Sequence, residues 1–323
     1  MIQDKIELLG TELLKDKNKL KIIDHWLGIM NWPNGWHYDL DIVWALRYIE
    51  QLNLPKGATI IDAGAGLGIT QFILASYGYN VISLDFADRQ VPRFTKNIFI
   101  VEKASHDLKG YTHEYMEFMN YGQKQVVNEK KKRGFNSFLK KMISPKRFGL
   151  NIYIAKNLFK KILNLRYIFE LMRDHSGFGK ITFLRGTFNN IPLSDNTADA
   201  LISISAFEHN TYEDMPSSIG EFMRVVKNGA PAFITTSASE KQDWYFKPPK
   251  AWNFSRNTLS SWFDISEESV TFNYREVFEN VIHSKILEKR IPLSYKLNAD
   301  NGLPYGRLSD AQYLPVGIIK VKK

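Results

Sequence analysis

Three glycines stand in the spacing Gly64-x-Gly66-x-Gly68 within the stretch IIDAGAGLG, directly after a short apolar run. A glycine-rich turn after a first strand lets the backbone approach a ligand at points where a Cβ atom would clash. The helix that follows such a turn presents N–H groups without intrahelical partners to polar or anionic ligand groups. These residues therefore predict a loop that binds a nucleoside-containing ligand.

Two acidic residues flank this loop and narrow the choice of ligand. Asp85 ends a second apolar run, where a carboxylate in a doubly wound fold accepts hydrogen bonds from both ribose hydroxyls. Asp62 precedes the loop, where it would repel a pyrophosphate and attract an ammonium group. The third glycine also comes one residue earlier than in the G-x-G-x-x-G pattern of dinucleotide sites. A ribose diol with an amino-acid tail fits both acids, which indicates S-adenosyl-L-methionine (SAM).

Further stretches of the chain resemble class I SAM-dependent methyltransferases of the methyltransferase type 11-like kind. IIDAGAGLG is similar to the first motif of that family. GTFNNIPLSDNTADALISISAFEHN, residues 186–210, resembles its segment that runs from G-D through L-P to E-H. EFMRVVKNGAPAFITT, residues 221–236, resembles its E-x-x-R-V-L-K-P-G-G helix and turn. The motifs occur in the family's order and cover residues 58–237, apart from an insertion.

The resemblance implies which residues bind the cofactor. Asp62 and the backbone of residues 64–68 would hold the amino-acid tail, Asp85 the ribose, and Phe86 would lie beside the adenine. Residues 203–206 would line the methyl-donor pocket. Many family members have an acid where this chain has Thr187, followed by Phe188, so a hydroxyl or backbone groups would contact the adenine here. The implied set is Asp62, Gly64, Ala65, Gly66, Gly68, Asp85, Phe86, Thr187, Phe188, Ser203 and Ser205.

Two histidines are candidates for a general base, which a hydroxyl acceptor would require. His209 follows the fourth predicted strand, at the edge where ligands bind in open α/β folds; alternatively, Glu208 and His209 simply begin the next helix. His37 lies in an N-terminal aromatic segment that could fold over the cofactor, and ordinary aromatic packing is the alternative. The histidines and carboxylates show no metal-ligand spacing, so we expect no metal.

The elements around these motifs predict a doubly wound α/β fold. Near-continuous apolar strands that alternate with helices are typical of a parallel sheet covered on both faces. The resemblance implies a Rossmann-like, mostly parallel sheet of seven strands. Strands are expected at residues 58–62, 80–86, 180–186, 199–205, 230–237 and 313–321.

Two segments stand outside this alternation. Residues 1–57 have a helical pattern and are predicted to form an N-terminal helical cap on a methyltransferase domain at residues 58–323. That domain is interrupted at about residues 90–178 by a long insertion, which is predicted to be helical and basic. The aromatic-rich residues 243–263 follow the fifth predicted strand and are expected either to line the acceptor pocket or to belong to the core.

The excess positive charge of the chain is local. Residues 103–180 contain 17 Lys and Arg against 6 Asp and Glu, and the rest of the chain is slightly acidic. Residues 150–172 within this segment place apolar side chains at helical spacing with lysines opposite. Such a helix could pack on its own domain, cover an anionic acceptor as a lid, or contact acidic lipid head groups. Nucleic acid is not expected as a partner, because no recognition module is present.

The sequence thus predicts a SAM-dependent methyltransferase that acts on a hydroxyl of a small molecule or glycan. A lipid-linked or membrane-surface acceptor, or a SAM-binding protein without catalysis, are the alternatives. The chain has no cysteine, and its first residues lack the apolar region of a secretory signal, so a cytoplasmic location is expected.

Overall fold

The computed structural model describes residues 2–30, 34–87, 93–104, 168, 171, 175–247, 249–291, 303 and 307–323. The chain divides into two units, one made of residues 1–106 and 176–323 and the other of residues 107–175. Only the first unit is described below. The predicted basic insertion, with its amphipathic stretch at residues 150–172, lies largely outside the described residues.

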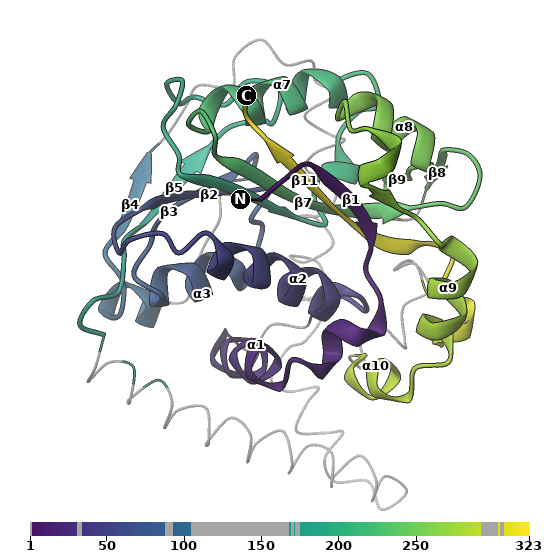
Figure 1. The fold of residues 1–323 in the computed structure, drawn as a ribbon. Helices are drawn as coiled ribbons and strands as arrows, with labels where there is room; N and C mark the ends of the chain where they lie inside the picture. The colour runs from purple at the N-terminus through teal and green to yellow at the C-terminus, as the bar shows by residue number, and fades with distance from the viewer. Residues whose placement is uncertain are drawn as a thin grey trace, which may run out of the picture. The chain divides into compact units, whose positions relative to one another are not determined.

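The first unit is built around a sheet with the strand order β10-β1-β11-β7-β6-β2-β3-β5-β4 (Figure 1). Strands β7, β6, β2, β3, β5 and β4 are mutually parallel, and β11 runs antiparallel between β7 and β1. The mostly parallel, Rossmann-like sheet predicted from the sequence is therefore confirmed. The strands are β1 Lys5–Leu8, β2 Thr59–Ala63, β3 Asn80–Asp85, β4 Val101–Ala104, β5 Ile181–Arg185, β6 Ala200–Ile204, β7 Pro231–Ala238, β10 Val270–Thr271 and β11 Leu314–Val321.

Helices cover both faces of this sheet. Figure 1 shows α2 and α3 on one face and α7 on the other. No helix in the described part of the chain is long and apolar enough to span a membrane. The α-helices are α1 Lys17–Met30, α2 Tyr38–Gln51, α3 Thr70–Ser76, α7 Met215–Val225, α8 Arg256–Trp262, α9 Tyr274–Ile282 and α10 Lys285–Arg290. The remaining elements are the 3-10 helices η1 Thr11–Lys15, η2 Arg93–Asn97, η4 Phe207–His209, η5 Glu267–Ser269 and η6 Leu308–Asp310, and a hairpin of β8 Trp244–Phe246 and β9 Ala251–Asn253.

The expected number of seven strands was wrong, because the sheet already has nine strands within the described residues. All six strands expected from the sequence are present within one or two residues of their predicted bounds. The short strands β1, β4 and β10 were not predicted. Strand β1, with the sequence KIEL, alternates charged and apolar residues and pairs with β11 from the other end of the chain. A four-residue strand whose partner is so distant leaves little local pattern to detect.

Helix α2 approaches the sheet closely because β11 carries a glycine at the contact. A Cβ atom on Gly317 would lie 2.4 Å from the Trp44 ring. The Trp44 indole N–H donates to Glu7 Oε1 at 2.8 Å, and the Tyr48 hydroxyl donates to the same oxygen at 2.8 Å. Because α2 leads into the start of β2, its first residues lie at the opposite edge, where the parallel strands end. This packing therefore fixes the position of His37 at the carboxyl edge of the sheet.

Replacing Gly317 with alanine should destabilise the protein, since the added methyl group collides with Trp44. We expect the free energy of unfolding to fall by about 1–3 kcal/mol, measured by urea denaturation. Gly220→Ala is the matched control: Gly220 lies in α7 with open space around it, and alanine there should stabilise the helix by about 0.5–1 kcal/mol. Equal effects of the two substitutions would contradict the tight contact.

Candidate cofactor and acceptor site

The glycine loop between β2 and α3 brings three predicted motifs into contact. Gly64 and Gly66 have φ values of +72° and +48°, in the left-handed region that favours glycine. A Cβ atom on Gly64 would lie 2.4 Å from the Ala206 Cβ and 2.7 Å from the Phe188 ring. The first motif therefore touches the segments that follow β5 and β6, as binding of one ligand by all three requires.

The Asp85 carboxylate lies beside this loop at the end of β3. Its Oδ2 accepts a hydrogen bond from the Gly66 N–H at 2.7 Å, and its Oδ1 accepts one from the Ala87 N–H at 2.8 Å. A Cβ atom on Gly66 would meet nothing closer than 3.9 Å, so there is space above this glycine beside the carboxylate. Each carboxylate oxygen has a second acceptor position for a ribose hydroxyl. The residues present thus fit a nucleoside.

The other loop residues close the turn. The N–H groups of Gly64 and Ala65 donate to the Leu84 carbonyl at 2.9 and 3.1 Å. The Gly68 N–H donates to the Ala65 carbonyl at 2.7 Å, and a Cβ on Gly68 would lie 2.8 Å from that carbonyl oxygen. The third glycine is therefore needed for the tightness of the turn, whereas the first two allow close contacts and a positive φ.

The remaining predicted cofactor residues line the ends of β2, β3, β5 and β6. Asp62 is buried in β2, in register with Ser83 and Ile202 of the neighbouring strands. Phe86 is buried, and the Arg185 guanidinium lies 5.9 Å from its ring centroid. Thr187 is also buried. The Ser203 hydroxyl is buried and has no hydrogen-bond partner among the described residues.

Ser205 occupies a strained position directly after β6. Its φ of +45° lies in the left-handed region, which costs a residue other than glycine about 1–2 kcal/mol. The Ser205 hydroxyl donates to Glu208 Oε1 at 2.6 Å, and the Thr236 hydroxyl donates to Glu208 Oε2 at 3.0 Å. The buried Glu208 carboxylate therefore holds the strained turn. Strain of this kind in a protein is concentrated at functional sites.

The E-x-x-R motif of α7 holds the segment that carries Thr187 and Phe188. The Glu221 carboxylate accepts from the Ile191 N–H at 2.7 Å and from Arg224 Nε at 2.6 Å. Arg224 also donates to the carbonyls of Leu193 and Ile191, at 2.7 and 2.8 Å. The hydrogen bond from Arg224 lowers the pKa of Glu221 below its usual range, although partial burial opposes this.

The candidate base His209 lies in η4, a separate 3-10 turn that ends before α7 begins. Its Nδ1 is 3.0 Å from the Lys250 carbonyl oxygen, which can only accept. This contact fixes the proton on Nδ1, so Nε2 is the acceptor in the neutral imidazole. The ring is half-buried.

The second candidate, His37, pairs with an acid that the sequence analysis missed. The His37 Nδ1 lies 2.6 Å from Asp41 Oδ2, and both side chains are buried. The His37 Nε2 is 3.4 Å from the Tyr313 hydroxyl. Burial raises the pKa of the Asp41 carboxyl, and the charge of Glu208 adds to this, while His37 opposes it. The i,i+4 spacing of His37 and Asp41 was the available signal in the sequence.

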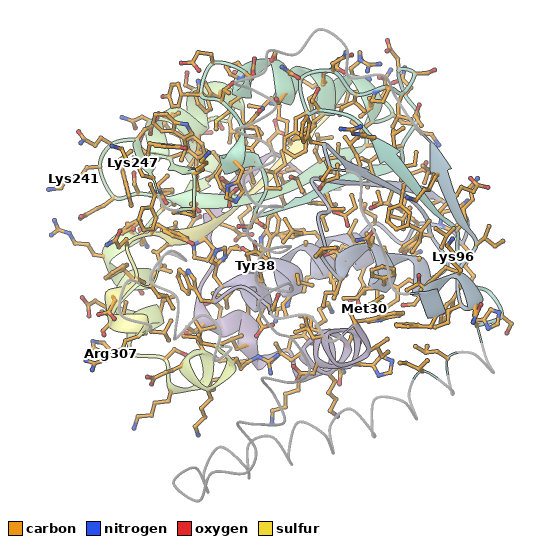
Figure 2. The ribbon with its side chains drawn as sticks, turned by 180° about the vertical axis from the view of Figure 1, so that it is seen from behind. Met30, Tyr38, Lys96, Lys241, Lys247 and Arg307 are labelled. Carbon is orange, nitrogen blue, oxygen red and sulfur yellow. The ribbon has the colours of Figure 1, made fainter. Side chains whose placement is uncertain are left out.

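The aromatic-rich residues 243–263 form the β8–β9 hairpin and α8. Their rings pack on one another and on Tyr212, whose ring centroid is 4.6 Å from that of Trp252. The Asp243 carboxylate accepts from the Tyr212 hydroxyl and from the Ser255 N–H, both at 2.6 Å. Lys241 and Lys247, before and after β8, project outward on the same side (Figure 2). Within the described residues, no group of His, Asp and Glu side chains is suited to hold a metal ion.

A doubly wound sheet with a glycine loop after its first parallel strand and an acid at the end of the second defines a Rossmann-like nucleoside-binding protein. The model of a family described as a methyltransferase domain matches residues 151–234. The matched residues do not include the glycine loop or Asp85, so the match and the site are separate observations that agree. Residues 151–234 are thus similar to a methyltransferase domain, and the geometry of the glycine loop and Asp85 fits the nucleoside of SAM.

Several solved structures are similar to this chain at low identity. The phosphoethanolamine N-methyltransferase 2 of Haemonchus contortus, a complex with S-adenosylhomocysteine, is 13% identical with a TM-score of 0.43, over 96% of this chain and 60% of that one. The 1,6-didemethyltoxoflavin-N1-methyltransferase of Burkholderia thailandensis is 9% identical with a TM-score of 0.40, and the alignment covers 100% of this chain and 97% of that one. The [4+2]-cyclase SpnF is 12% identical with a TM-score of 0.44, and the alignment covers 90% of this chain and 84% of that one. A comparison with curated proteins gives no match.

Removing the Asp85 carboxylate should weaken binding of S-adenosylhomocysteine by about 10- to 100-fold, because charged hydrogen bonds contribute about 1.5–3 kcal/mol. Calorimetric titration of Asp85→Ala measures this. Asp199→Ala is the matched control: Asp199 accepts from the Thr59 N–H at 2.8 Å at the other end of β2, away from the loop. Unchanged affinity in Asp85→Ala would disprove the ribose contact.

Replacing Glu221 with glutamine should destabilise the protein in a pH-dependent manner. Because the folded-state pKa is lowered, the stabilisation is present above the unfolded pKa of about 4.5 and is lost as the pH falls through the folded value. We expect a loss of about 1–2 kcal/mol at pH 7 that shrinks towards pH 3.5, measured by urea denaturation. Glu268→Gln, at an exposed carboxylate, is the control and should change little. A loss independent of pH would contradict the role of the charge.

Proposed function

We propose that the chain is a SAM-dependent methyltransferase that acts on a hydroxyl group of a small molecule or glycan and works in the cytoplasm. The observation that carries the proposal is the arrangement of His209 and His37 at the carboxyl edge of the sheet. Each ring has its Nδ1 held by an oxygen acceptor, which favours Nε2 as the atom that takes a proton. Such a base is what a hydroxyl acceptor requires.

SAM, when bound, supplies a methyl group on a positively charged sulfur. The Gly64–Gly66 turn, Asp62 and Asp85 would hold the cofactor, and alignment with exclusion of water contributes about 7–11 kcal/mol in well-oriented reactions. A histidine Nε2 would take the hydroxyl proton of the acceptor as the methyl group passes to its oxygen, and the cofactor would leave as S-adenosylhomocysteine once its carbon–sulfur bond breaks. The proton then resides on the imidazole and leaves to solvent.

His209 is the first candidate for this role. It is half-buried and follows β6, three residues after Ala206, which touches the glycine loop. His37 is the second candidate, and the Asp41 carboxylate would stabilise its imidazolium form in the manner of a carboxylate–histidine pair. The two histidines differ in burial: His37 is almost completely buried, whereas His209 is half-buried.

A lipid-linked acceptor at an acidic membrane surface is the second candidate, supported by the excess of basic residues at 103–180. Flotation with acidic vesicles separates the two acceptor classes. Salt-sensitive binding that is lost when the basic residues of 130–161 are neutralised supports the lipid-linked acceptor. No flotation favours a free small molecule or glycan.

Removal of the base should reduce turnover without affecting the cofactor. In His209→Asn the amide N–H can still donate to the Lys250 carbonyl, but no group remains to take the proton. We expect the rate of methyl transfer from isotope-labelled SAM to a pool of hydroxyl compounds to fall by about 10²–10⁴-fold. S-adenosylhomocysteine affinity should stay unchanged.

His37→Gln is the companion variant in the same assay. Loss of turnover in His37→Gln alone would assign the base to His37. Full activity in both variants would contradict an acceptor that needs a base at this edge.

A further inference from the structure

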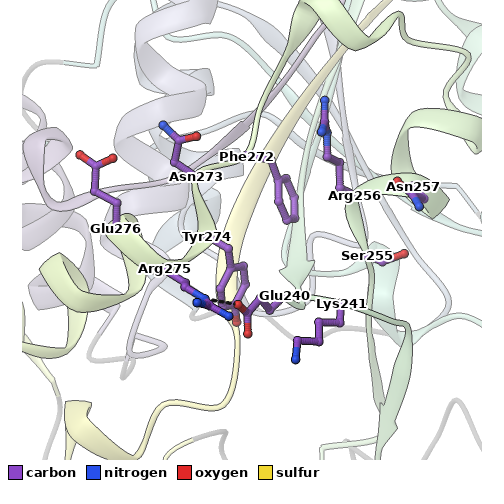
Figure 3. Close-up of a pocket in the computed structure, with 10 residues that line it drawn as sticks. All are labelled: Glu240, Lys241, Ser255, Arg256, Asn257, Phe272, Asn273, Tyr274, Arg275 and Glu276. Atoms are coloured by element: carbon purple, nitrogen blue, oxygen red, sulfur yellow. Dashed lines mark hydrogen bonds and ion pairs between the residues drawn. The ribbon is translucent and has the colours of Figure 1, made fainter.

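A cavity of about 470 Å³ opens beside the segment that follows β7 (Figure 3). Its wall is formed by Glu240 and Lys241 after β7, by the start of α8, and by residues 272–276, which lead from β10 into the first turn of α9. Small-molecule sites commonly measure about 300–1,000 Å³. None of the cofactor residues discussed above lines it.

The cavity lies at the same edge of the sheet as the glycine loop but over the other half. Strand β10 is parallel to β1, and β1 and β7 are both antiparallel to β11. The ends of β7 and β10 therefore point to the edge where β2 and β3 end. Ligands bind at this edge in open α/β sheets. The cavity therefore lies where a second ligand would bind beside the cofactor.

The charges of the cavity are balanced. The Arg275 Nε lies 2.6 Å from Glu240 Oε1, and Arg256 forms an ion pair with Glu267 outside the cavity lining. Lys241 and Glu276 have no ion-pair partner among the described residues and carry opposite charges. The lining therefore favours neither an anion nor a cation.

Several polar groups of the wall are available to a ligand. The side chains of Asn257 and Asn273 form no hydrogen bond within the described part of the chain, and Asn273 precedes α9 without capping it. Both asparagine side chains are exposed, so a ligand in the cavity can reach them. Each amide offers N–H donors and a carbonyl acceptor. Each sugar hydroxyl likewise can donate one hydrogen bond and accept others, so the two kinds of group are complementary.

An aromatic ring completes the site. Phe272 is half-buried, and Figure 3 shows its ring between Arg256 and Tyr274. The ring centroids of Phe272 and Tyr274 are 6.2 Å apart. An aromatic face gives an apolar surface for the C–H face of a pyranose ring. A zwitterion would use only the two opposite charges and would leave both amides and the ring without a role.

We propose that this cavity binds a neutral sugar ring through Phe272, Asn257 and Asn273. Its role as the subsite that holds a glycan acceptor rests on the proposed function, whereas the binding of the sugar does not. The sugar hydroxyls form hydrogen bonds with the two amides, and the sugar ring stacks on Phe272.

The test is binding of methyl glycosides of glucose, galactose, mannose and N-acetylglucosamine to the full chain, followed by saturation-transfer NMR and calorimetry. At least one should bind with a Kd on the order of 1 mM or tighter. Phe272→Ala and Asn257→Ala should each weaken it about fivefold or more, whereas Phe272→Tyr should retain it. Asn18→Ala, an exposed asparagine of α1, is the matched control.

The outcomes separate this inference from the proposed function. No binding of any glycoside, binding that the cavity variants leave unchanged, or preferential binding of glycine or alanine as zwitterions would each overturn it. S-adenosylhomocysteine affinity should be the same in all variants, because the cofactor site is elsewhere. Sugar binding at the cavity without methyl transfer to any glycan would confirm that the cavity binds sugars. The same result would contradict the proposal that a glycan is the methyl acceptor.

Discussion

The site depends on one point where the backbone has no room for a side chain. At Gly64 the loop after β2 meets Phe188 after β5 and Ala206 after β6, and a single Cβ atom would separate them. The positive φ of the same residue turns the chain into α3. Two further contacts hold the site around this approach: Asp85 accepts a hydrogen bond from Gly66, and Glu221 of the E-x-x-R pair accepts one from Ile191 in the segment of Phe188. The chemistry is thus positioned by backbone contacts more than by long side chains.

Much of this arrangement could be predicted from the sequence, because its signals are local. The glycine spacing, the acids at two strand ends and the apolar runs each depend on fewer than about ten neighbouring residues, and β2, β3, β5, β6, β7 and β11 were located from them. The resemblance to methyltransferases likewise rests on short motifs. The identity of the individual cofactor and base residues remains a prediction.

What the sequence did not predict depends on partners distant in the chain. Strand β1 becomes a strand because β11 pairs with it, and β4 and β10 are short edge strands of the same kind. The importance of Glu208 comes from its contacts with Ser205 and Thr236 on a neighbouring strand. The cavity beside β7 is formed by three segments, none of which has a distinctive motif. In each case the feature arises from tertiary packing between distant segments, and the local propensities of the residues do not predict it.

The pairing of β1 with β11 has a consequence for how the chain folds. Asp4, just before β1, accepts hydrogen bonds from the Val321 N–H at 2.7 Å and from Lys320 at 2.9 Å. Strand β1 therefore cannot join the sheet until β11 has been synthesised. Contacts between residues so far apart close a very large loop, and such topologies fold slowly. Until β11 has been synthesised, the surface of α2 around Trp44 lacks the strand that covers it, and nascent chains would offer that apolar surface to chaperones.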